Sequence, residues 1–425
     1  MGRMVVRIGT APLIGQGTQG MKLGILFVDD DPNILQALQR MLRGQRAEWD
    51  MSFCDSPVRA LALLEQRHFD VVVSDMRMPD LDGADLLSQV ERAHPGTLRV
   101  VLSGYSEKHS IFRSIGPAHQ YLAKPCSPEL ILTLMERALA MRRILADEHM
   151  RRLASGLRTL PSLPDLYLPL TRAMEKDSVT VGEIADLVGR DVAMTAELLK
   201  ITNSAFFALG AHMTTAEQAV KLLGMETVRN LVLVSGIFRQ YEAGPGQDKL
   251  RALSGYSLQT GQLARQLALE NGENSDLAAL AQCAGMMSVI GALVLFDAFG
   301  SRYGAAVAEA GPETLEDCER RTFGASHCEL GAYLLSLWGF PDAVVEAVLY
   351  ALRPSALGGG SRMVTSYLHL ARALGADFPL PLKADRCCAV LDEIYTGALA
   401  LRATVNGEMV LADGRRTGKG RTCNA

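Results

Sequence analysis

An unbroken apolar run that ends in a single acid limits the folds open to this chain. Val71, Val72 and Val73 lead through Ser74 to Asp75, and a loop rich in Pro, Asp and Gly follows. A run without alternation of apolar and polar residues is typical of a strand buried on both faces, as in a parallel sheet. Asp75 is therefore predicted at the carboxyl end of a central strand, where open α/β sheets place their functional groups.

Other strand-like runs also end in polar side chains that would meet Asp75 at one sheet edge. They are Asp29 and Asp30 after ILFV, Ser103 after RVVL and Lys124 after QYLA. The acids are hard oxygen ligands that suit Mg²⁺ with several waters retained, and the hydroxyl and ammonium could hold phosphoryl oxygens. Such a site could transfer a phosphoryl group onto a carboxylate. The simpler alternative is that these acids only cap helices and turns.

The order and spacing of these residues resemble the receiver domain of two-component response regulators, over roughly residues 21–145. The resemblance implies a flavodoxin-like fold, a doubly wound parallel five-stranded sheet with one Mg²⁺, and Asp75 as the phosphoacceptor for a sensor histidine kinase. It implies Asp30 and Asp75 as direct metal ligands, Asp29 acting through water, and the backbone carbonyl of Arg77 as a further ligand.

The same resemblance assigns the residues that would respond to phosphorylation. Ser103 matches the switch hydroxyl and Tyr121 the switch aromatic residue. Lys124 matches the phosphate-binding lysine, and it precedes Pro125, at which we expect a cis peptide bond.

The segment after the α/β pattern predicts one long linker helix from Pro128 to about Arg152. Its apolar residues recur at helical spacing and no Gly or Pro interrupts it; they are Ile131, Leu134, Ala138, Met141 and Leu145. Such a seam could pack on the next domain or pair with a second copy of the chain as a homodimer. A shorter last helix followed by an irregular linker is the alternative.

From residue 157 onward helical periodicity dominates, which predicts an all-α domain. Several segments together resemble the HDOD family, a degenerate branch of the HD metal phosphohydrolases; they are LPSLPDLYLPL, ITNSAFFALG with TTAEQAVKLLG, and SHCELGAYLLSLWGFPDAVVEAVLY. Taken alone, their large apolar residues, Phe206, Phe207, Leu222, Leu223, Leu334, Leu335 and Trp338, are those expected of a core.

An active HD enzyme needs a His, a His-Asp pair and a further Asp to hold metal. Where the resemblance places the first His this chain has Tyr256, and the pair is replaced by Ser288 and Val289. His327 matches a position of the family, and a lone His is more often a structural residue than a ligand. We therefore expect no catalytic residue in this domain; the alternative is a metal-dependent phosphodiesterase controlled by a receiver.

Composition limits the classes of partner and the cellular location expected for this chain. The chain has 425 residues and a net charge of −4, which gives no electrostatic footprint for nucleic acid. Its eight scattered cysteines contain no CxxC pair, and no apolar run reaches the expected length of a membrane span. A cytoplasmic protein is therefore predicted.

The predicted organisation follows the chain in order. It consists of a disordered extension (1–20), a receiver domain (21–127), a linker helix (128–156), an HDOD-like all-α domain (157–375), a C-terminal helical extension (376–412) and a disordered basic tail (413–425). Met1 and Met21 both remain possible starts. The predicted function is that of a phosphorelay response regulator that signals to an unknown downstream protein through a non-catalytic domain.

Overall fold

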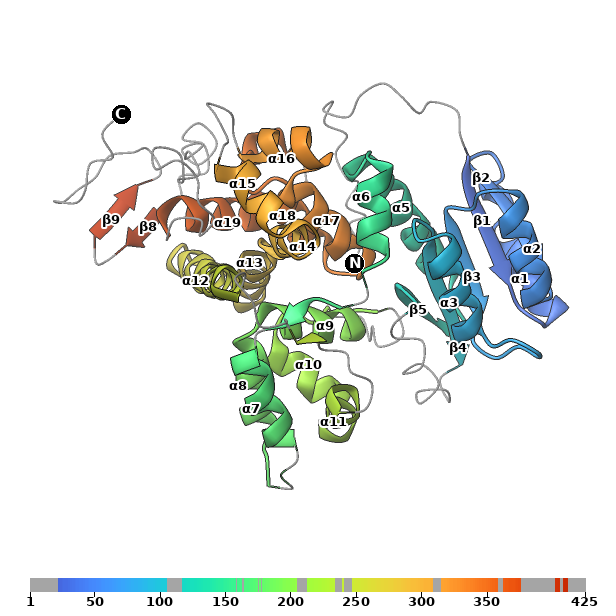
Figure 1. The fold of residues 1–425 in the computed structure, drawn as a ribbon, viewed down its shortest axis with the longest axis horizontal. Helices are drawn as coiled ribbons and strands as arrows, with labels where there is room; N and C mark the ends of the chain where they lie inside the picture. Colours follow the sequence, from blue (N-terminus) through green and yellow to red (C-terminus); the bar gives the residue numbers. More distant parts are fainter. Residues whose placement is uncertain are drawn as a thin grey trace.

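The computed structural model joins an α/β domain to a mostly helical region (Figure 1). It describes residues 22–104, 117–157, 159–162, 164–174, 176, 178–204, 212–233, 239–240, 247–308, 315–357, 362–375, 402–405 and 408–411. Some predictions fall outside these residues, namely the two disordered ends, Phe206, Phe207 and most of the C-terminal helical extension (376–412).

The α/β domain contains the predicted five-stranded parallel sheet. Its strands are β1 (Leu23–Val28), β2 (Trp49–Cys54), β3 (Val71–Asp75), β4 (Leu98–Gly104) and β5 (Gln120–Lys124). Their order is β2-β1-β3-β4-β5, and every pairing is parallel. The strand β3 lies at the centre and is buried along its whole length, because its Val run faces apolar neighbours on both sides of the sheet.

Helices flank this sheet and begin at the residues that sequence signals indicate. They are α1 (Pro32–Met41), α2 (Pro57–Gln66), α3 (Gly83–Ala93) and α5 (Pro128–Ile144), with a short 3₁₀ turn at Arg43–Gln45. Asp31, Ser56, Asp82 and Ser127 are the N-caps, and each side chain accepts a hydrogen bond from a backbone N–H of the first turn. Three of these helices begin with proline, whose fixed φ suits the first position.

The prediction of one long linker helix is wrong. Helix α5 ends at Ile144, Leu145 is extended, and a second helix, α6 (Glu148–Ser155), starts after the N-cap Asp147, which accepts from the backbone N–H of Met150. The break needs no Gly or Pro, because the Asp147 cap and the burial of Leu145 stabilise the turn.

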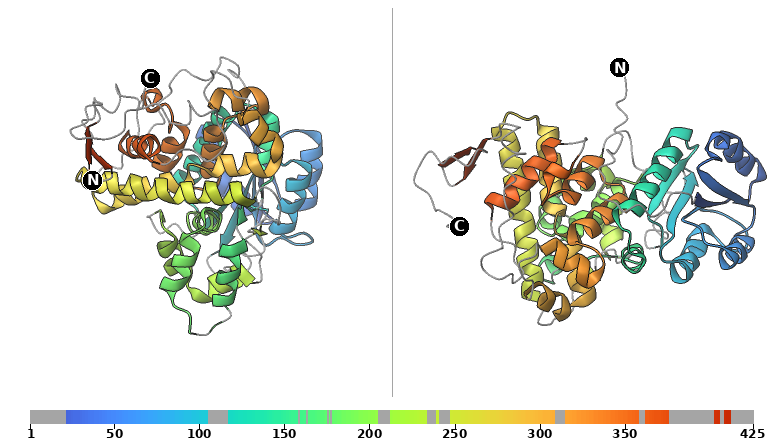
Figure 2. Two further views of the ribbon diagram at one scale, coloured as in Figure 1. Left: turned by 60° about the vertical axis from the view of Figure 1, so that its left-hand side comes forward. Right: turned by 90° about the horizontal axis from the view of Figure 1, so that it is seen from above.

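The apolar seam of this segment is nevertheless buried within the single chain. Met141 is 4% and Leu145 is 1% exposed, and both belong to the core that α5 shares with its neighbours. In Figures 1 and 2, α5 and α6 lie between the sheet and the helical region. Packing on the helical region therefore covers these residues, and no second copy is needed to do so.

The helical region has the all-α character predicted for it. Its helices are α7 (Pro164–Met174), α8 (Val181–Gly189), α9 (Val192–Thr202), α10 (Ala216–Leu223), α11 (Met225–Leu233), α12 (Gln247–Glu270), α13 (Ser275–Met287), α14 (Ile290–Phe299), α15 (Ser301–Ala308), α16 (Leu315–Phe323), α17 (His327–Leu337), α18 (Asp342–Leu349) and α19 (Arg362–Leu374). A 3₁₀ turn (Pro354–Ala356) and a short parallel pair, β6 (Pro161–Ser162) with β7 (Arg239–Gln240), complete it.

Two differences from the predicted elements have local causes. Helical periodicity predicts one helix from Ser275 to Ala298, but this stretch is two helices, because Ser288 and Val289 form a turn in which the Ser288 hydroxyl donates to the carbonyl of Gly285. Part of the expected C-terminal helical extension is a strand pair, β8 (Arg402–Val405) with β9 (Glu408–Leu411). The sequence between them is Asn-Gly, the dipeptide most typical of a tight hairpin turn.

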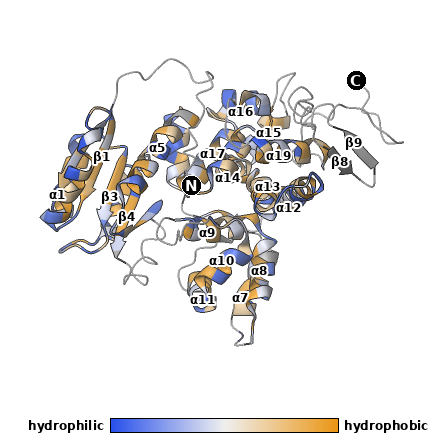
Figure 3. Cartoon of the chain, turned by 180° about the vertical axis from the view of Figure 1, so that it is seen from behind, coloured by the Kyte–Doolittle hydropathy of each residue, from blue (hydrophilic) through white to orange (hydrophobic). Residues whose placement is uncertain are grey.

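Hydropathy follows this architecture. Figure 3 shows hydrophobic residues along the strands of the sheet and more hydrophilic colours along α12. Within the described residues one stretch, Ser275–Phe299, is apolar and long enough to cross a membrane, contrary to the expectation from sequence, but 83% of its most apolar window is buried inside the fold. It is the central helical layer of the second domain.

Candidate functional site

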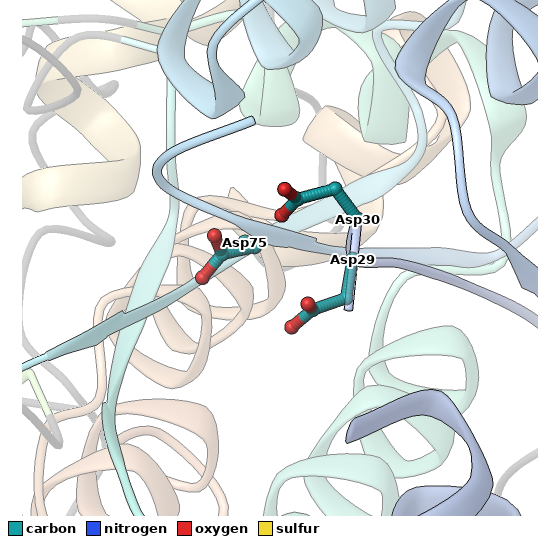
Figure 4. Close-up of side chains that lie close together, drawn as sticks. All are labelled: Asp29, Asp30 and Asp75. Carbon is teal, nitrogen blue, oxygen red and sulfur yellow. The ribbon is translucent and has the colours of Figure 1, made fainter. Parts of the chain in front are cut away.

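The carboxyl ends of β1 and β3 bring three acids together. Asp29, Asp30 and Asp75 each offer a carboxylate oxygen, and these oxygens lie within 4.8 Å of one another. Figure 4 shows the three side chains gathered at this edge of the sheet. Asp29 is 1% and Asp75 is 8% exposed, whereas Asp30 faces solvent. The prediction that these acids form one cluster is confirmed.

Lys124, the last residue of β5, completes the charge arrangement. Its Nζ lies 2.7 Å from Oδ2 of Asp29 and also contacts Oδ1 of Asp75. Burial raises the pKa of Asp75 against the opposing effect of Lys124. Burial acts to lower the pKa of Lys124, but its hydrogen bonds to Asp29 and Asp75 prevail and raise it. The ammonium therefore stays charged beside two carboxylates, where it can also meet a phosphoryl group.

The backbone around Asp75 is held by the start of α3. The amide N–H of Arg77 donates to Oδ2 of Asp75 at 3.1 Å, and Gly83 N–H donates to the carbonyl of Met76 at 2.9 Å. A Cβ on Gly83 would lie 2.0 Å from the Asp75 carbonyl oxygen, so only glycine allows this approach. Nothing tests the predicted use of the Arg77 carbonyl as a ligand, and it stays a prediction.

The two residues predicted to act as a switch lie on neighbouring strands. Ser103 is fully buried near the end of β4, and Tyr121 is 5% exposed on β5. The register pairs Ser103 with Ala123 and Val101 with Tyr121. Lys124 is followed by a cis peptide bond to Pro125, as predicted. Ser103 and Lys124 thus lie near the carboxyl ends of their strands, beside the acids, whereas Tyr121 lies near the amino end of β5.

The positions that would hold metal in the helical region are buried without forming a metal cluster. Tyr256 is 5% exposed on α12, while Ser288 and Val289 are fully buried in the turn between α13 and α14. Among the residues that the structure describes, only Asp29, Asp30 and Asp75 bring three His, Cys, Asp or Glu ligands so close together.

His327 takes part in a buried network that sequence reasoning did not find. Its Nδ1 lies 2.7 Å from Oε2 of Glu319, whose Oε1 accepts a 2.5 Å hydrogen bond from the hydroxyl of Tyr303. The Arg372 guanidinium lies 3.3 Å from Nε2 of His327. Burial opposes protonation of His327, but Cys328 and Glu319 raise its pKa well above its usual range. No local sequence pattern links these helices, because the partners come from α15, α16, α17 and α19.

Removing Asp30 should weaken Mg²⁺ binding at the acid cluster without unfolding the domain. Asp30 is exposed, whereas Oδ1 of the buried Asp29 accepts a hydrogen bond from the backbone N–H of Asp31. We expect Asp30→Ala to lower the Mg²⁺ affinity about tenfold or more in isothermal titration calorimetry. Glu217→Ala removes an exposed carboxylate from α10 and is the matched control. Equal affinity in Asp30→Ala and the control would remove Asp30 from the metal site.

Comparisons with known proteins assign the two parts of the chain separately. The model of the response regulator receiver domain matches residues 25–136, and the model of the HDOD domain matches residues 160–354. Together these matches cover the α/β domain and most of the helical region.

Individual relatives match only parts of the chain. An uncharacterised protein of Treponema pallidum is 28% identical over 202 residues, which are 47% of this chain and 38% of the relative. The hydrogenase transcriptional regulatory protein HoxA of Cupriavidus necator is 32% identical over 137 residues, 32% of this chain and 27% of that protein. The chain thus spans well under half the length of either relative.

Two solved structures are similar to parts of the chain. The MmoQ response regulator of Methylococcus capsulatus is 22% identical, with a TM-score of 0.41, and the match covers 50% of this chain and 86% of that one. The receiver domain of an HD domain-containing protein from Pseudomonas fluorescens is 31% identical, with a TM-score of 0.27, over 28% of this chain and 96% of that one.

Proposed function

The chain combines a response regulator receiver domain with an HDOD domain, and from this premise we propose that it is a phosphorelay response regulator with a non-catalytic output domain. A histidine kinase would phosphorylate Asp75, and the HDOD domain would pass the signal to another protein in the cytoplasm. The observation that carries the proposal is the cluster of Asp29, Asp30 and Asp75 with Lys124 at one sheet edge.

Each residue of this cluster would have its own role in phosphoryl transfer. Asp75 is the nucleophile: its carboxylate oxygen attacks phosphorus, and the bond to the histidine of the donor breaks. Asp30 and Asp75 would hold a Mg²⁺ ion directly and Asp29 would hold it through water, and the ion would neutralise phosphoryl charge when it is bound. Lys124 contacts two of the acids, and its ammonium group can shift to bind the new phosphoryl oxygens.

The response to phosphorylation would begin at Ser103 and Tyr121. The phosphoryl group would attract the Ser103 hydroxyl, and the Tyr121 ring would follow into the space behind it. Both side chains are already buried on adjacent strands, so a small displacement there must be shared by their neighbours. This is a two-state switch biased by one local change of charge.

The residues at the expected metal-ligand positions support a non-catalytic role for the HDOD domain. Tyr256, Ser288 and Val289 stand where the HD resemblance requires His, His and Asp, and all are buried. Val289 has no ligand atom, and a cationic guanidinium, that of Arg372, lies beside His327. A positive charge at that place disfavours a divalent cation. The alternative, a metal-dependent phosphodiesterase, lacks a matching set of ligands among the described residues.

Metal analysis of the full-length protein separates these two functions. After purification without added metal and dialysis against a weak chelator, we expect Mn, Fe and Zn well below one atom per chain. We also expect no hydrolysis of bis-p-nitrophenyl phosphate when Mn²⁺ is added. Stoichiometric metal that persists in Asp30→Ala would place a centre in the HDOD domain and revive the phosphodiesterase.

A further inference from the structure

Strand β5 connects the acid cluster with the HDOD domain. Lys124 at its carboxyl end bonds Asp29 and Asp75. Gln120 at its amino end donates from Nε2 to the carbonyl oxygen of Leu337, the last residue of α17, at 2.7 Å. Four strand intervals of about 3.3 Å separate the two ends by about 13 Å. One rigid element therefore touches both the phosphorylation site and the output domain.

The absence of a side chain at Gly339 allows the Gln120 amide to approach the backbone of the HDOD domain closely. Gly339 follows α17 with φ +76°, and a Cβ there would lie 2.9 Å from Nε2 of Gln120 and 3.0 Å from the carbonyl oxygen of Asn203. Asn203 caps α9 and bonds the backbone of Met213 in both directions. The tip of the Gln120 side chain thus enters a joint between α17 and the end of α9.

A second contact across the same surface is ionic. The Arg137 guanidinium on α5 lies 3.0 Å from the Asp342 carboxylate at the first residue of α18. Arg137 is 18% and Asp342 is 43% exposed, so the pair lies at the rim of the contact. Because each charge belongs to a different domain, the pair can be reversed without altering either domain's own core.

A third contact lies beside the first, at the amino ends of β4 and β5. The carbonyl oxygen of Ser155, at the end of α6, accepts from the Arg99 guanidinium at 2.8 Å and from Nε2 of His119 at 2.9 Å. The Ser155 hydroxyl lies 3.0 Å from the hydroxyl of Tyr333 on α17. Burial and the Arg99 charge hold the pKa of His119 well below its usual range, so its ring is neutral and can donate only once. Such a satisfied buried network favours one docked arrangement over many.

From these contacts we infer that the α17–α18 surface of the HDOD domain (Leu337, Gly339 and Asp342) is a docking site for the chain's own receiver, and that Gln120 couples this docking to Asp75. Phosphorylation draws Lys124 to the phosphoryl group, displaces β5 and weakens the contacts of Gln120 and Arg137. The surface then becomes available to the downstream protein. The direction of this effect rests on the proposed function; the docking site itself does not.

Hydrogen exchange of the full-length protein tests both parts. Arg137→Asp and Asp342→Arg should each raise the exchange rates of α18 amides about fivefold, the loss expected for a half-exposed ion pair. The double variant should restore the wild-type rates. Arg59→Asp removes an exposed ion pair with Asp55 on α2 and should leave α18 unchanged. Failure of the double variant to restore protection would overturn the docking site.

Beryllofluoride with Mg²⁺, a mimic of the phosphoryl group, tests the coupling. It should raise exchange of the same α18 amides in wild type. In Gln120→Ala the exchange should already be raised and should not respond further, although beryllofluoride still binds. Bound beryllofluoride that leaves wild-type α18 unchanged, or an unaltered response in Gln120→Ala, would overturn the coupling. Absence of beryllofluoride binding would instead contradict the proposed function, and the charge reversal would still decide the docking site.

Discussion

Asp75→Asn should abolish binding of beryllofluoride, whereas the wild-type chain should bind one per molecule in the presence of Mg²⁺. The substitution keeps the size of the side chain and an oxygen that can accept from the Arg77 N–H. It removes the negative oxygen that would attack phosphorus or coordinate beryllium. Since burial already raises the pKa of Asp75 and Lys124 retains Asp29 as a partner, loss of this charge should not unfold the domain.

Fluorine NMR or calorimetry can measure this binding, with circular dichroism as the check on folding. Asp248→Asn changes a fully solvated carboxylate on α12 and is the matched control. Incubation with a small acyl phosphate should likewise add one phosphoryl group to the control and none to Asp75→Asn, as seen by intact mass. Binding of beryllofluoride by folded Asp75→Asn at wild-type strength would exclude Asp75 as the phosphoacceptor.

The acid cluster could be predicted because each of its residues ends a strand. A buried parallel strand has a strong sequence signature, and parallel topology places the strand ends together. The clustering of these side chains could therefore be predicted without knowledge of long-range packing. The structure brings together Asp29, Asp30, Asp75 and Lys124.

Other features depend on packing between distant segments. The contacts of Gln120 with Leu337 and of Arg372 with His327 join residues that no local pattern relates. The break of the linker helix did leave a signal: Asp147 followed by Glu148 is a helix start, with a capping acid and a second acid in the first turn. The prediction of one continuous helix gave more weight to the uninterrupted helical spacing of apolar residues. Periodicity alone cannot show where a helix ends.

Gly291→Ala should destabilise the HDOD domain more than the same substitution at any other of its glycines that the structure describes. Gly291 lies two residues after Val289, at the start of α14, where α14 crosses α17. A Cβ on Gly291 would lie 1.9 Å from the carbonyl oxygen of His327 and 2.8 Å from the amide nitrogen of Gly331. Backbone atoms cannot turn aside as a flexible side chain can, so the two helices must separate. We expect a loss of about 3 kcal/mol or more in unfolding free energy.

Urea unfolding followed by circular dichroism measures this loss, and the receiver can be followed independently through beryllofluoride binding. Gly255→Ala is the matched control, because it lies within α12 and a Cβ there meets nothing within 4 Å. It should be neutral or stabilising by up to about 1 kcal/mol. If Gly291→Ala were as stable as Gly255→Ala, α14 would not lie against the backbone of α17. The space beside His327 would then be larger than the structure shows, and the case against a metal centre there would lose its support from packing.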